Sequence, residues 1–349
     1  MVKSMLPSEF TFTFLVLNVV SQIGFMPEPH YLAKLAASGQ CGQDSSIGIG
    51  ANIHYTGSMK SLDGKLVAAN VQKAIADEVQ KEIQAGRPTP GLAVVLVGED
   101  PASQVYVGSK VKTCQALGFA SFEHRLAANV TFAEIKKLIL TLNQDSKVHG
   151  ILVQLPLPKQ LNESEVIALI APQKDADCLT SQNVGLLFQH KQIISSCTPS
   201  GVMEILKYYK YDLEGLNAVV VGRSQIVGLP MAQLLIQANA TVTVAHSRTK
   251  NLKVLTQQAD LVIAAIGKPQ FFSGDYFKAG AIVVDVGIHR VDNKLETKKL
   301  CGDVNWGDKG DEINHLEACT PVPGGVGPTT IAMLMQNTFK LYKLSQGVN

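Results

Sequence analysis

The chain has 349 residues, a length that suits two domains better than one. Hydrophobic residues make up 46% of the chain and charged residues 17%, which provides apolar material for packed cores and excludes a largely disordered protein. The 31 Lys and Arg residues nearly balance the 29 Asp and Glu residues, so the basic surplus typical of nucleic-acid-binding proteins is absent. We therefore expect a globular protein that has no nucleic-acid partner.

The cysteines exclude two further classes of protein. The chain has 6 of them, scattered, with no C-x-x-C pair and no histidine at ligand spacing. This distribution argues against a structural zinc site and against a small disulfide-bonded scaffold. Scattered thiols suit a reducing compartment. We expect no metal site and a cytoplasmic location.

Residues 1–58 differ in composition from the rest of the chain. They contain a short apolar run at 10–20, which is shorter than the roughly 20 apolar residues that a membrane-spanning helix needs. Lys3 is the only basic residue before this run, so the segment is a poor secretory signal. Residues 1–58 contain no Arg, so they are also a poor mitochondrial presequence. We expect a poorly ordered, dispensable extension and no membrane span, with Met59 as an alternative start of the chain.

The next part of the chain alternates between helical and strand patterns. Apolar residues recur at helical spacing over 63–84, and a continuous apolar run flanked by glycines follows at 91–98, as in a buried parallel strand. Such alternation predicts an α/β domain with a parallel sheet covered by helices. The further elements expected here are helices at 101–117, 132–142 and 161–170 and a strand at 150–154.

A second α/β pattern begins at Ala218. Its first strand is followed by a helix at 229–238, and three more apolar strands follow. This order is typical of a Rossmann-like nucleotide-binding domain, with its ligand at the carboxyl ends of the strands. The later strands are expected at 241–245, 260–267 and 281–287, and a last helix at 331–344.

The turns of the second domain indicate which nucleotide it binds. The first turn reads VGRSQIVG, in which Gly222 is followed by Arg223 and by Ser224 at the position of the second glycine of the G-x-G-x-x-G motif. Taken alone, it is a generic Rossmann-like turn. The second strand ends in a segment with Ser247 and Arg248 and without the carboxylate that holds the ribose of NAD. Arginine and serine can instead bind a 2′-phosphate, which favours NADP over NAD.

Polar residues of the first domain suggest a catalytic site. Tyr106 and Lys110 are four residues apart and so share one helix face, although such a pair can equally be an ordinary solvated one. Gln154 ends a buried strand, where α/β folds place their sites. Asp175 and Asp177 follow, and a carboxylate can pair with the amidine-like edge of a pterin.

These motifs together resemble one enzyme family, the bifunctional methylenetetrahydrofolate dehydrogenase/cyclohydrolases. The similarity runs from about residue 62 to about residue 344 without large gaps. It implies oxidation of 5,10-methylenetetrahydrofolate with NADP, then hydrolysis to 10-formyltetrahydrofolate, in the one-carbon metabolism that serves purine, histidine and methionine biosynthesis. The motifs are Ala102-Ser103-x-x-Tyr106-Val107-x-x-Lys110, GILVQLPLP from Gly150, Lys174-Asp175-x-Asp177, VGRS-x-IVG-x-P from Val221, and PVPGGVGP from Pro321.

The resemblance also implies an architecture. We expect two α/β domains around a cleft, a C-terminal helix that returns to the first domain, and a homodimer assembled through the cofactor domains. The expected boundaries are a folate-binding catalytic domain at 59–196 plus 320–349 and a Rossmann-like NADP-binding domain at 197–319.

Family roles can be placed on the matching residues. Lys110 is expected to transfer the proton in the cyclohydrolase step, with Gln154 and Tyr106 positioning it and the folate. Asp177 is expected to bind the pterin. Ser103 and the loop residues Pro323 and Gly324 complete the expected folate site, and Gly222, Arg223, Ser224, Ser247, Arg248 and Ile288 are the expected NADP contacts.

Two residues depart from the family pattern. Cys178 stands where the family usually has Gly, and Thr329 where it usually has Met. Two alternative functions remain. One is a monofunctional NAD(P)-dependent dehydrogenase of the same fold, and the other is a catalytically silent folate- or nucleotide-binding protein. The presence of Lys110, Gln154 and Asp177 argues against both.

Overall fold

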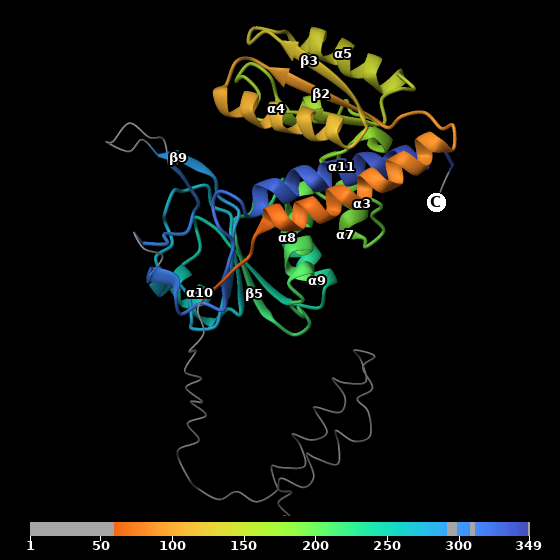
Figure 1. Cartoon of the computed structure of the whole chain (residues 1–349). Coiled ribbons are helices and arrows are strands. Elements are labelled where there is room, and N and C mark those ends of the chain that lie inside the picture. The colour runs from red at the N-terminus through yellow and green to blue at the C-terminus, as the bar shows by residue number, and fades with distance from the viewer. Residues whose placement is uncertain (1–58, 292–298, 308–310, 348–349) are drawn as a thin grey trace, which may run out of the picture. The chain divides into compact units, whose positions relative to one another are not determined.

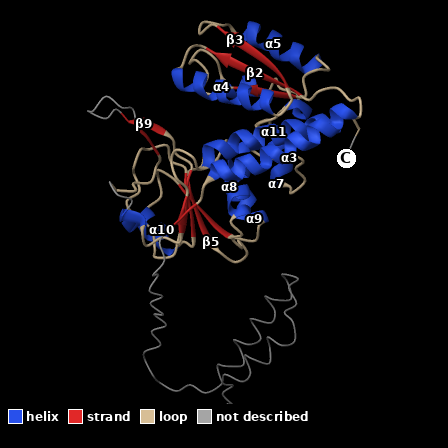
Figure 2. Ribbon diagram, viewed as in Figure 1, coloured by secondary structure: helices blue, strands red, loops and turns tan. Residues whose placement is uncertain are grey.

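The computed structural model describes residues 59–291, 299–307 and 311–347 (Figure 1). The expectation for the extension at 1–58 lies outside these residues. Within the described ranges, no helix has both the length and the apolar character needed to cross a membrane. The described elements form two parallel sheets with helices around them, together with a two-stranded antiparallel pair of β9 (His289–Val291) and β10 (Lys299–Cys301) (Figure 2).

The first sheet has three parallel strands in the order β3-β2-β4. Its central strand β2 (Gly91–Val97) is buried along its whole length, as the apolar run predicts, and β4 (Gly150–Val153) is buried too. The sequence analysis did not identify β3 (Ala120–Leu126). This strand lies at the sheet edge and carries Glu123, His124 and Arg125, so it has no continuous apolar run.

The second sheet has six parallel strands in the order β1-β11-β8-β7-β5-β6. The strands predicted at 218–222, 241–245, 260–267 and 281–287 are confirmed as β5 (Asn217–Val221), β6 (Thr241–Ala245), β7 (Leu261–Ala264) and β8 (Ile282–Asp285). The strand order reverses between β5 and β7, and such a switch point is where open α/β sheets bind ligands.

The edge of the second sheet corrects one predicted boundary. The short strand β1 (Lys60–Ser61) pairs in parallel with β11 (Ala318–Cys319), which in turn pairs with β8. Residues 60–61 therefore belong to the second sheet, and not to the first domain to which 59–196 was assigned. Two-residue strands have no periodicity, so the sequence pattern could not reveal this pairing.

The C-terminal helix α11 (Val326–Ser345) returns to the first domain, as expected (Figure 1). It packs along α3 (Gly64–Gln84) and α8 (Cys197–Tyr208) and also contacts β2 and β4. Phe339 and Tyr342 lie in the same buried cluster as residues of β2, so α11 completes the core of the first domain.

Local signals account for the start of the helices that flank the cleft. Asp63 caps α3 by accepting a hydrogen bond from the Lys65 N–H (2.8 Å), and Asp100 caps α4 (Pro101–Ala116) by accepting one from Ser103 (2.7 Å). The remaining elements are α5 (Phe132–Gln144), α6 (Glu163–Ile167), α7 (Ser181–Phe188), α9 (Gly228–Gln237), α10 (Leu252–Gln258), β9 (His289–Val291), β10 (Lys299–Cys301) and three short 3₁₀ turns.

Candidate functional site

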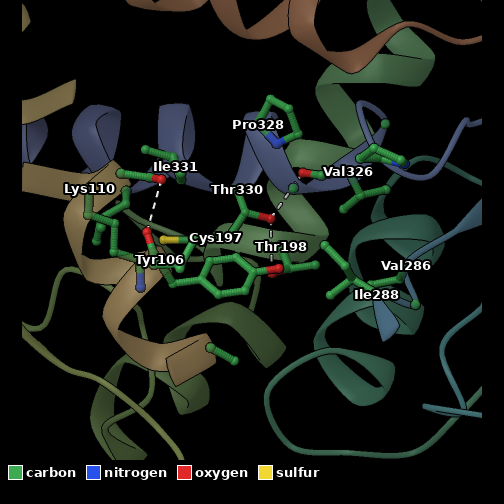
Figure 3. Close-up of a pocket in the computed structure, with 18 of the residues that line it drawn as sticks. Tyr106, Lys110, Cys197, Thr198, Val286, Ile288, Val326, Pro328, Thr330 and Ile331 are labelled. Atoms are coloured by element: carbon green, nitrogen blue, oxygen red, sulfur yellow. Dashed lines mark hydrogen bonds between the residues drawn. The ribbon is translucent and has the colours of Figure 1, made fainter. Parts of the chain in front are cut away.

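A cleft of about 1110 Å³ lies between the two sheets, walled by α4, the segment after β4, the segment after β8 and the loop before α11. Figure 3 shows the Tyr106 ring pointing from α4 into this space, with Val286 and Ile288 on another wall. The predicted residues that the fold brings together here are Ser103, Tyr106, Lys110, Gln154, Asp177, Ile288, Pro323 and Gly324.

Lys110 lies at the inner end of the cleft and is held by Gln154. Its Nζ donates a hydrogen bond to Gln154 Oε1 at 2.9 Å. The amide of Gln154 is itself fixed, because its Nε2 donates to the carbonyl of Leu155 at 2.6 Å. Burial lowers the pKa of Lys110, and the negative charge of Asp177 opposes this shift. The environment therefore makes the neutral amine, which can accept a proton, accessible at a lower pH than in a solvated lysine.

The two neighbouring aspartates have different surroundings. Asp175 is buried and accepts hydrogen bonds from the Thr180 backbone N–H (2.8 Å), the Thr180 hydroxyl (2.7 Å) and the Asn183 amide (2.9 Å). These bonds fix the turn that leads to α7, so Asp175 is a structural residue. Asp177 lines the cleft instead. Burial raises the pKa of Asp177, and the charge of Lys110 opposes that rise.

Helix α4 presents Ser103, Tyr106 and Lys110 on one face, as their spacing predicts. Burial raises the pKa of the Tyr106 hydroxyl, which is therefore protonated at neutral pH and can donate a hydrogen bond. Ser103 is buried in the first turn of the helix next to its cap, Asp100.

The turn between β5 and α9 brings the backbone close to neighbouring segments. Gly222 has φ +139°, and a Cβ there would lie 2.2 Å from the carbonyl oxygen of Ala265. A Cβ on Gly228 would lie 2.2 Å from the carbonyl oxygen of Gly222. Ser224 Oγ accepts hydrogen bonds from the N–H groups of Val227 (3.1 Å) and Gly228 (3.3 Å). Ser224 thus shapes the start of α9, a role that the sequence analysis did not foresee.

The predicted phosphate-binding residues Arg223, Ser247 and Arg248 occupy adjacent loops. Val221 is in register with Ala245 across β5 and β6, so the two loops leave the sheet at the same edge. All three side chains are exposed. They are not among the residues that line the cleft, which reaches this region through Ile226 and Val227.

Several cleft residues were missed by the sequence analysis. Thr198 of α8 and Thr330 of α11 line the cleft, and their hydroxyls are joined by a hydrogen bond of 3.2 Å (Figure 3). Cys197 lies beside them, and burial raises the pKa of its thiol well above the usual value. Pro199 in the first turn marks a helix start, but nothing in the sequence places this start at the cleft.

A carboxylate network supports the cleft wall after β8. Asp303 is completely buried, and its carboxylate accepts hydrogen bonds from the N–H groups of Ile266 (2.7 Å), Gly267 (3.1 Å) and Lys268 (2.9 Å). It also lies 2.8 Å from the Nε2 atom of His289. Asp303 therefore ties the loop after β7 to the strand β9.

Comparisons with known proteins identify the family of the chain. The family model described as tetrahydrofolate dehydrogenase/cyclohydrolase, catalytic domain, matches residues 62–177, and the NAD(P)-binding domain model of the same family matches residues 196–346. The chain is 50% identical over 287 residues to the bifunctional protein FolD of Magnetococcus marinus, which covers 82% of this chain and 98% of that relative.

Solved structures are similar over the same region. The structure of the bifunctional enzyme FolD, a methylenetetrahydrofolate dehydrogenase/cyclohydrolase, from Campylobacter jejuni is 45% identical with a TM-score of 0.78, covering 82% of this chain and 99% of that one. The enzyme of Trypanosoma brucei, complexed with NADP cofactor and inhibitor, is 38% identical with a TM-score of 0.79, covering 83% and 99%.

Proposed function

The chain belongs to the tetrahydrofolate dehydrogenase/cyclohydrolase family, and from that premise we propose which of its residues carry the two reactions. The protein is an NADP-dependent methylenetetrahydrofolate dehydrogenase and methenyltetrahydrofolate cyclohydrolase. It oxidises 5,10-methylenetetrahydrofolate to the 5,10-methenyl form and hydrolyses that product to 10-formyltetrahydrofolate. The observation that carries our assignment is the Lys110–Gln154 hydrogen bond beside Asp177 at the inner end of the cleft.

The β5–α9 turn fits the pyrophosphate of a dinucleotide. Glycine at 222 and 228 lets the turn pack closely against the backbone of Ala265 and of Gly222 itself, and the first N–H groups of α9 favour negative charge. Arg223, Ser247 and Arg248 would hold the 2′-phosphate from the two adjacent loops. When bound, NADP accepts the hydride that leaves the one-carbon bridge of the folate.

The dehydrogenase step requires orientation more than acid–base catalysis, because the cation that forms is stabilised by its two flanking nitrogens. Asp177 would accept hydrogen bonds from the amidine-like edge of the pterin and fix its position. The Tyr106 ring would pack beside the folate, and the loop with Pro323 and Gly324 would close the wall opposite α4. Holding the reacting atoms in one geometry contributes most of the rate in such a step.

The cyclohydrolase step requires proton transfer, which we assign to Lys110. Water adds to the methenyl carbon, and the neutral Nζ accepts a proton from it as the C–O bond forms. The protonated Nζ then returns a proton to N5 as the C–N5 bond breaks, and the hydroxyl on the same carbon loses its proton to solvent, leaving the formyl group on N10. Gln154 Oε1 holds Nζ in place through both transfers.

We also propose a homodimer and a cytoplasmic location. Strand β6 lies at the edge of the six-stranded sheet, and pairing with a second copy would protect this edge. Among the described residues, the free thiols of Cys114, Cys178, Cys197 and Cys319 suit a reducing compartment. Light scattering on the purified protein tests the dimer, since a monomeric mass at working concentration would exclude it.

One assay tests the proposed function. The protein is mixed with 5,10-methylenetetrahydrofolate and NADP, and both NADPH and the methenyl form are followed over time. With the bifunctional enzyme, less of the methenyl form than of NADPH accumulates, because the enzyme hydrolyses the methenyl form faster than buffer does. A monofunctional dehydrogenase accumulates the two products equally, apart from background hydrolysis, and a silent binding protein produces neither.

A further inference from the structure

The cleft face of α4 has an inner and an outer end. Lys110, Tyr106, Ser103 and Asp100 are spaced by four, three and three residues and all line the cleft. At 1.5 Å per helical residue, Lys110 and Asp100 are about 15 Å apart along the helix axis. Lys110 lies at the inner end, and Asp100 is exposed at the outer end.

An arginine from the second domain faces this outer end. Arg290 of β9 lines the cleft together with Leu300, its partner in the β9–β10 pair. The pKa of Asp100 is lowered first by the hydrogen bond from Ser103 and further by the positive charge of Arg290. The same charge opposes the effect of burial on the pKa of Tyr106. Arg290 thus acts on two residues of the α4 face.

The guanidinium of Arg290 acts on Asp100 and Tyr106 only through its charge. Its side chain is exposed, and among the described residues no hydrogen bond or ion pair holds it. An unpaired arginine in a binding cleft is suited to bidentate recognition of a carboxylate.

The folate substrate carries such carboxylates. Its pterin end bears the reacting carbon, and a p-aminobenzoyl group joins it to a glutamate. If the pterin lies at Lys110 and Asp177, the p-aminobenzoyl-glutamate part of the folate must extend away from the inner end of the cleft. The lining residues Gln72, Thr113 and Leu334 are uncharged and offer nothing to an anionic tail, whereas the outer end of α4 offers Arg290.

We propose that Arg290 binds the glutamate carboxylate of the folate at the outer end of the cleft and thereby makes the enzyme selective for glutamylated folates. This inference rests on the proposed function. Arg290 also offsets the negative charge of Asp100, which would otherwise repel the tail.

Lys65 is the competing cation in the cleft. It belongs to the first turn of α3 and lies against Gly324, where its Cε would be 3.3 Å from an added Cβ. This position is beside the loop before α11. Arg290 lines the cleft, and its charge acts on Asp100 and Tyr106 of the α4 face, so it is the better candidate.

Three substrates and four proteins test the inference. The substrates are 5,10-methylenetetrahydrofolate, its triglutamate, and 5,10-methylenetetrahydropteroate, which lacks glutamate. The proteins are the wild type, Arg290→Ala, Lys65→Ala and, as a matched control, Lys112→Ala, which removes an exposed cation of α4 that does not line the cleft. KM and kcat of the dehydrogenase reaction are measured for each pair, together with KM for NADP.

We expect Arg290→Ala to raise KM for both glutamylated folates on the order of tenfold, with kcat and KM for NADP little changed. The pteroate should be used equally well by Arg290→Ala, the wild type and Lys112→Ala. An equal loss on pteroate and folate would show that Arg290 positions the domains, and would overturn the inference. It would also be overturned if Lys65→Ala, and not Arg290→Ala, abolished the preference for glutamate. Failure of the wild type to oxidise any of the three substrates would instead reject the proposed function.

Discussion

Lys110 illustrates how one residue acquires a catalytic property from its surroundings. Burial destabilises the charged ammonium, while the nearby Asp177 carboxylate stabilises it. Burial likewise destabilises the charged form of Asp177. Since burial is the larger effect for both groups, the pKa of Lys110 lies below its ordinary value, and Lys110 can act as a base at a lower pH than a solvated lysine.

The pH dependence of the cyclohydrolase step should report this balance. The neutral Lys110 is the active form, so kcat should rise with pH along a limb that lies below the usual pKa of lysine. Asp177→Asn removes a charge that raises the pKa of Lys110, and the limb should therefore move to lower pH. The measurement is kcat against pH at saturating methenyltetrahydrofolate, corrected for hydrolysis in buffer.

A control variant, Asp100→Asn, removes another carboxylate of the same cleft. Asp100 lies about 15 Å from Lys110 along the axis of α4. The limb of this variant should stay at the wild-type pH. A limb that does not move in Asp177→Asn, or that moves equally in both variants, would remove Lys110 as the titrating group.

Cofactor preference should depend on Arg223. A charge-assisted hydrogen bond contributes about 1.5–3 kcal/mol, so Arg223→Ala should weaken the binding of NADP about tenfold to a hundredfold. NAD has no 2′-phosphate and should be affected much less. The affinities of both cofactors are compared in Arg223→Ala and in the double variant with Ser247→Ala. Equal weakening of both cofactors would place Arg223 at the turn or the pyrophosphate, and Arg248 would become the next candidate.

Cys178 shows what a family pattern can and cannot indicate about a single residue. The resemblance leads one to expect Gly after Asp177, and the structure gives Cys178 φ +58°, in the left-handed region that glycine adopts most readily. The Cys178 side chain is buried in the core of the first domain. The sequence flags this substitution but carries no information about the backbone angle or about the core that accommodates the thiol.

At the scale of elements, the buried strands were predictable and the edge elements were not. The strand β2 is entirely apolar because both of its faces are covered, whereas β3 has charged residues and β1 has only two residues. Helix α6 is shorter than the predicted 161–170, because Asn162 caps a helix that begins at Glu163. Gln154 could be predicted as a cleft residue because it follows the buried strand β4. Thr198 and Thr330 could not, because they meet only through the packing of α8 against α11.

The loop after β7 provides a prediction at this scale. Asp303 accepts three backbone hydrogen bonds from the loop and contacts His289. In Asp303→Asn an amide NH₂ group, which is a donor, replaces one carboxylate oxygen, and this leaves buried backbone N–H groups without an acceptor. We expect a loss of about 3 kcal/mol in the free energy of unfolding. It is measured from the midpoint of urea unfolding followed by circular dichroism.

Asp275→Asn is the matched control, because Asp275 forms an exposed ion pair with Lys253. Loss of this ion pair should lower the free energy of unfolding by less than about 1 kcal/mol. If Asp303→Asn were no more destabilising than this control, Asp303 would not anchor the loop.

At the scale of the whole molecule, the fold places one cleft between two sheets and closes it with helices that serve both. Helix α11 begins in the core of the second sheet with Val326 and ends in the core of the first with Tyr342. The general architecture followed from the alternation of strands and helices. The pairing of β1 with β11 joins residues far apart in the chain, and such a contact leaves no local pattern.

A chain that starts at Met59 should keep both activities. Every residue assigned to the site lies beyond this position, and the described part of the chain contains both sheets. We expect kcat and KM for both reactions within about twofold of the full chain, and the same mass in solution. Loss of activity or of solubility on deleting residues 1–58 would show that this segment supports the fold.

The most direct test of the role of Lys110 compares Lys110→Met with Lys112→Met in the hydrolysis of methenyltetrahydrofolate. Both variants remove a lysine from α4, but only Lys110 lines the cleft and bonds to Gln154. The proposed mechanism predicts that Lys110→Met hydrolyses the methenyl form no faster than buffer while still binding NADP, and that Lys112→Met hydrolyses it like the wild type. Wild-type hydrolysis by Lys110→Met would contradict the mechanism and remove Lys110 from the reaction.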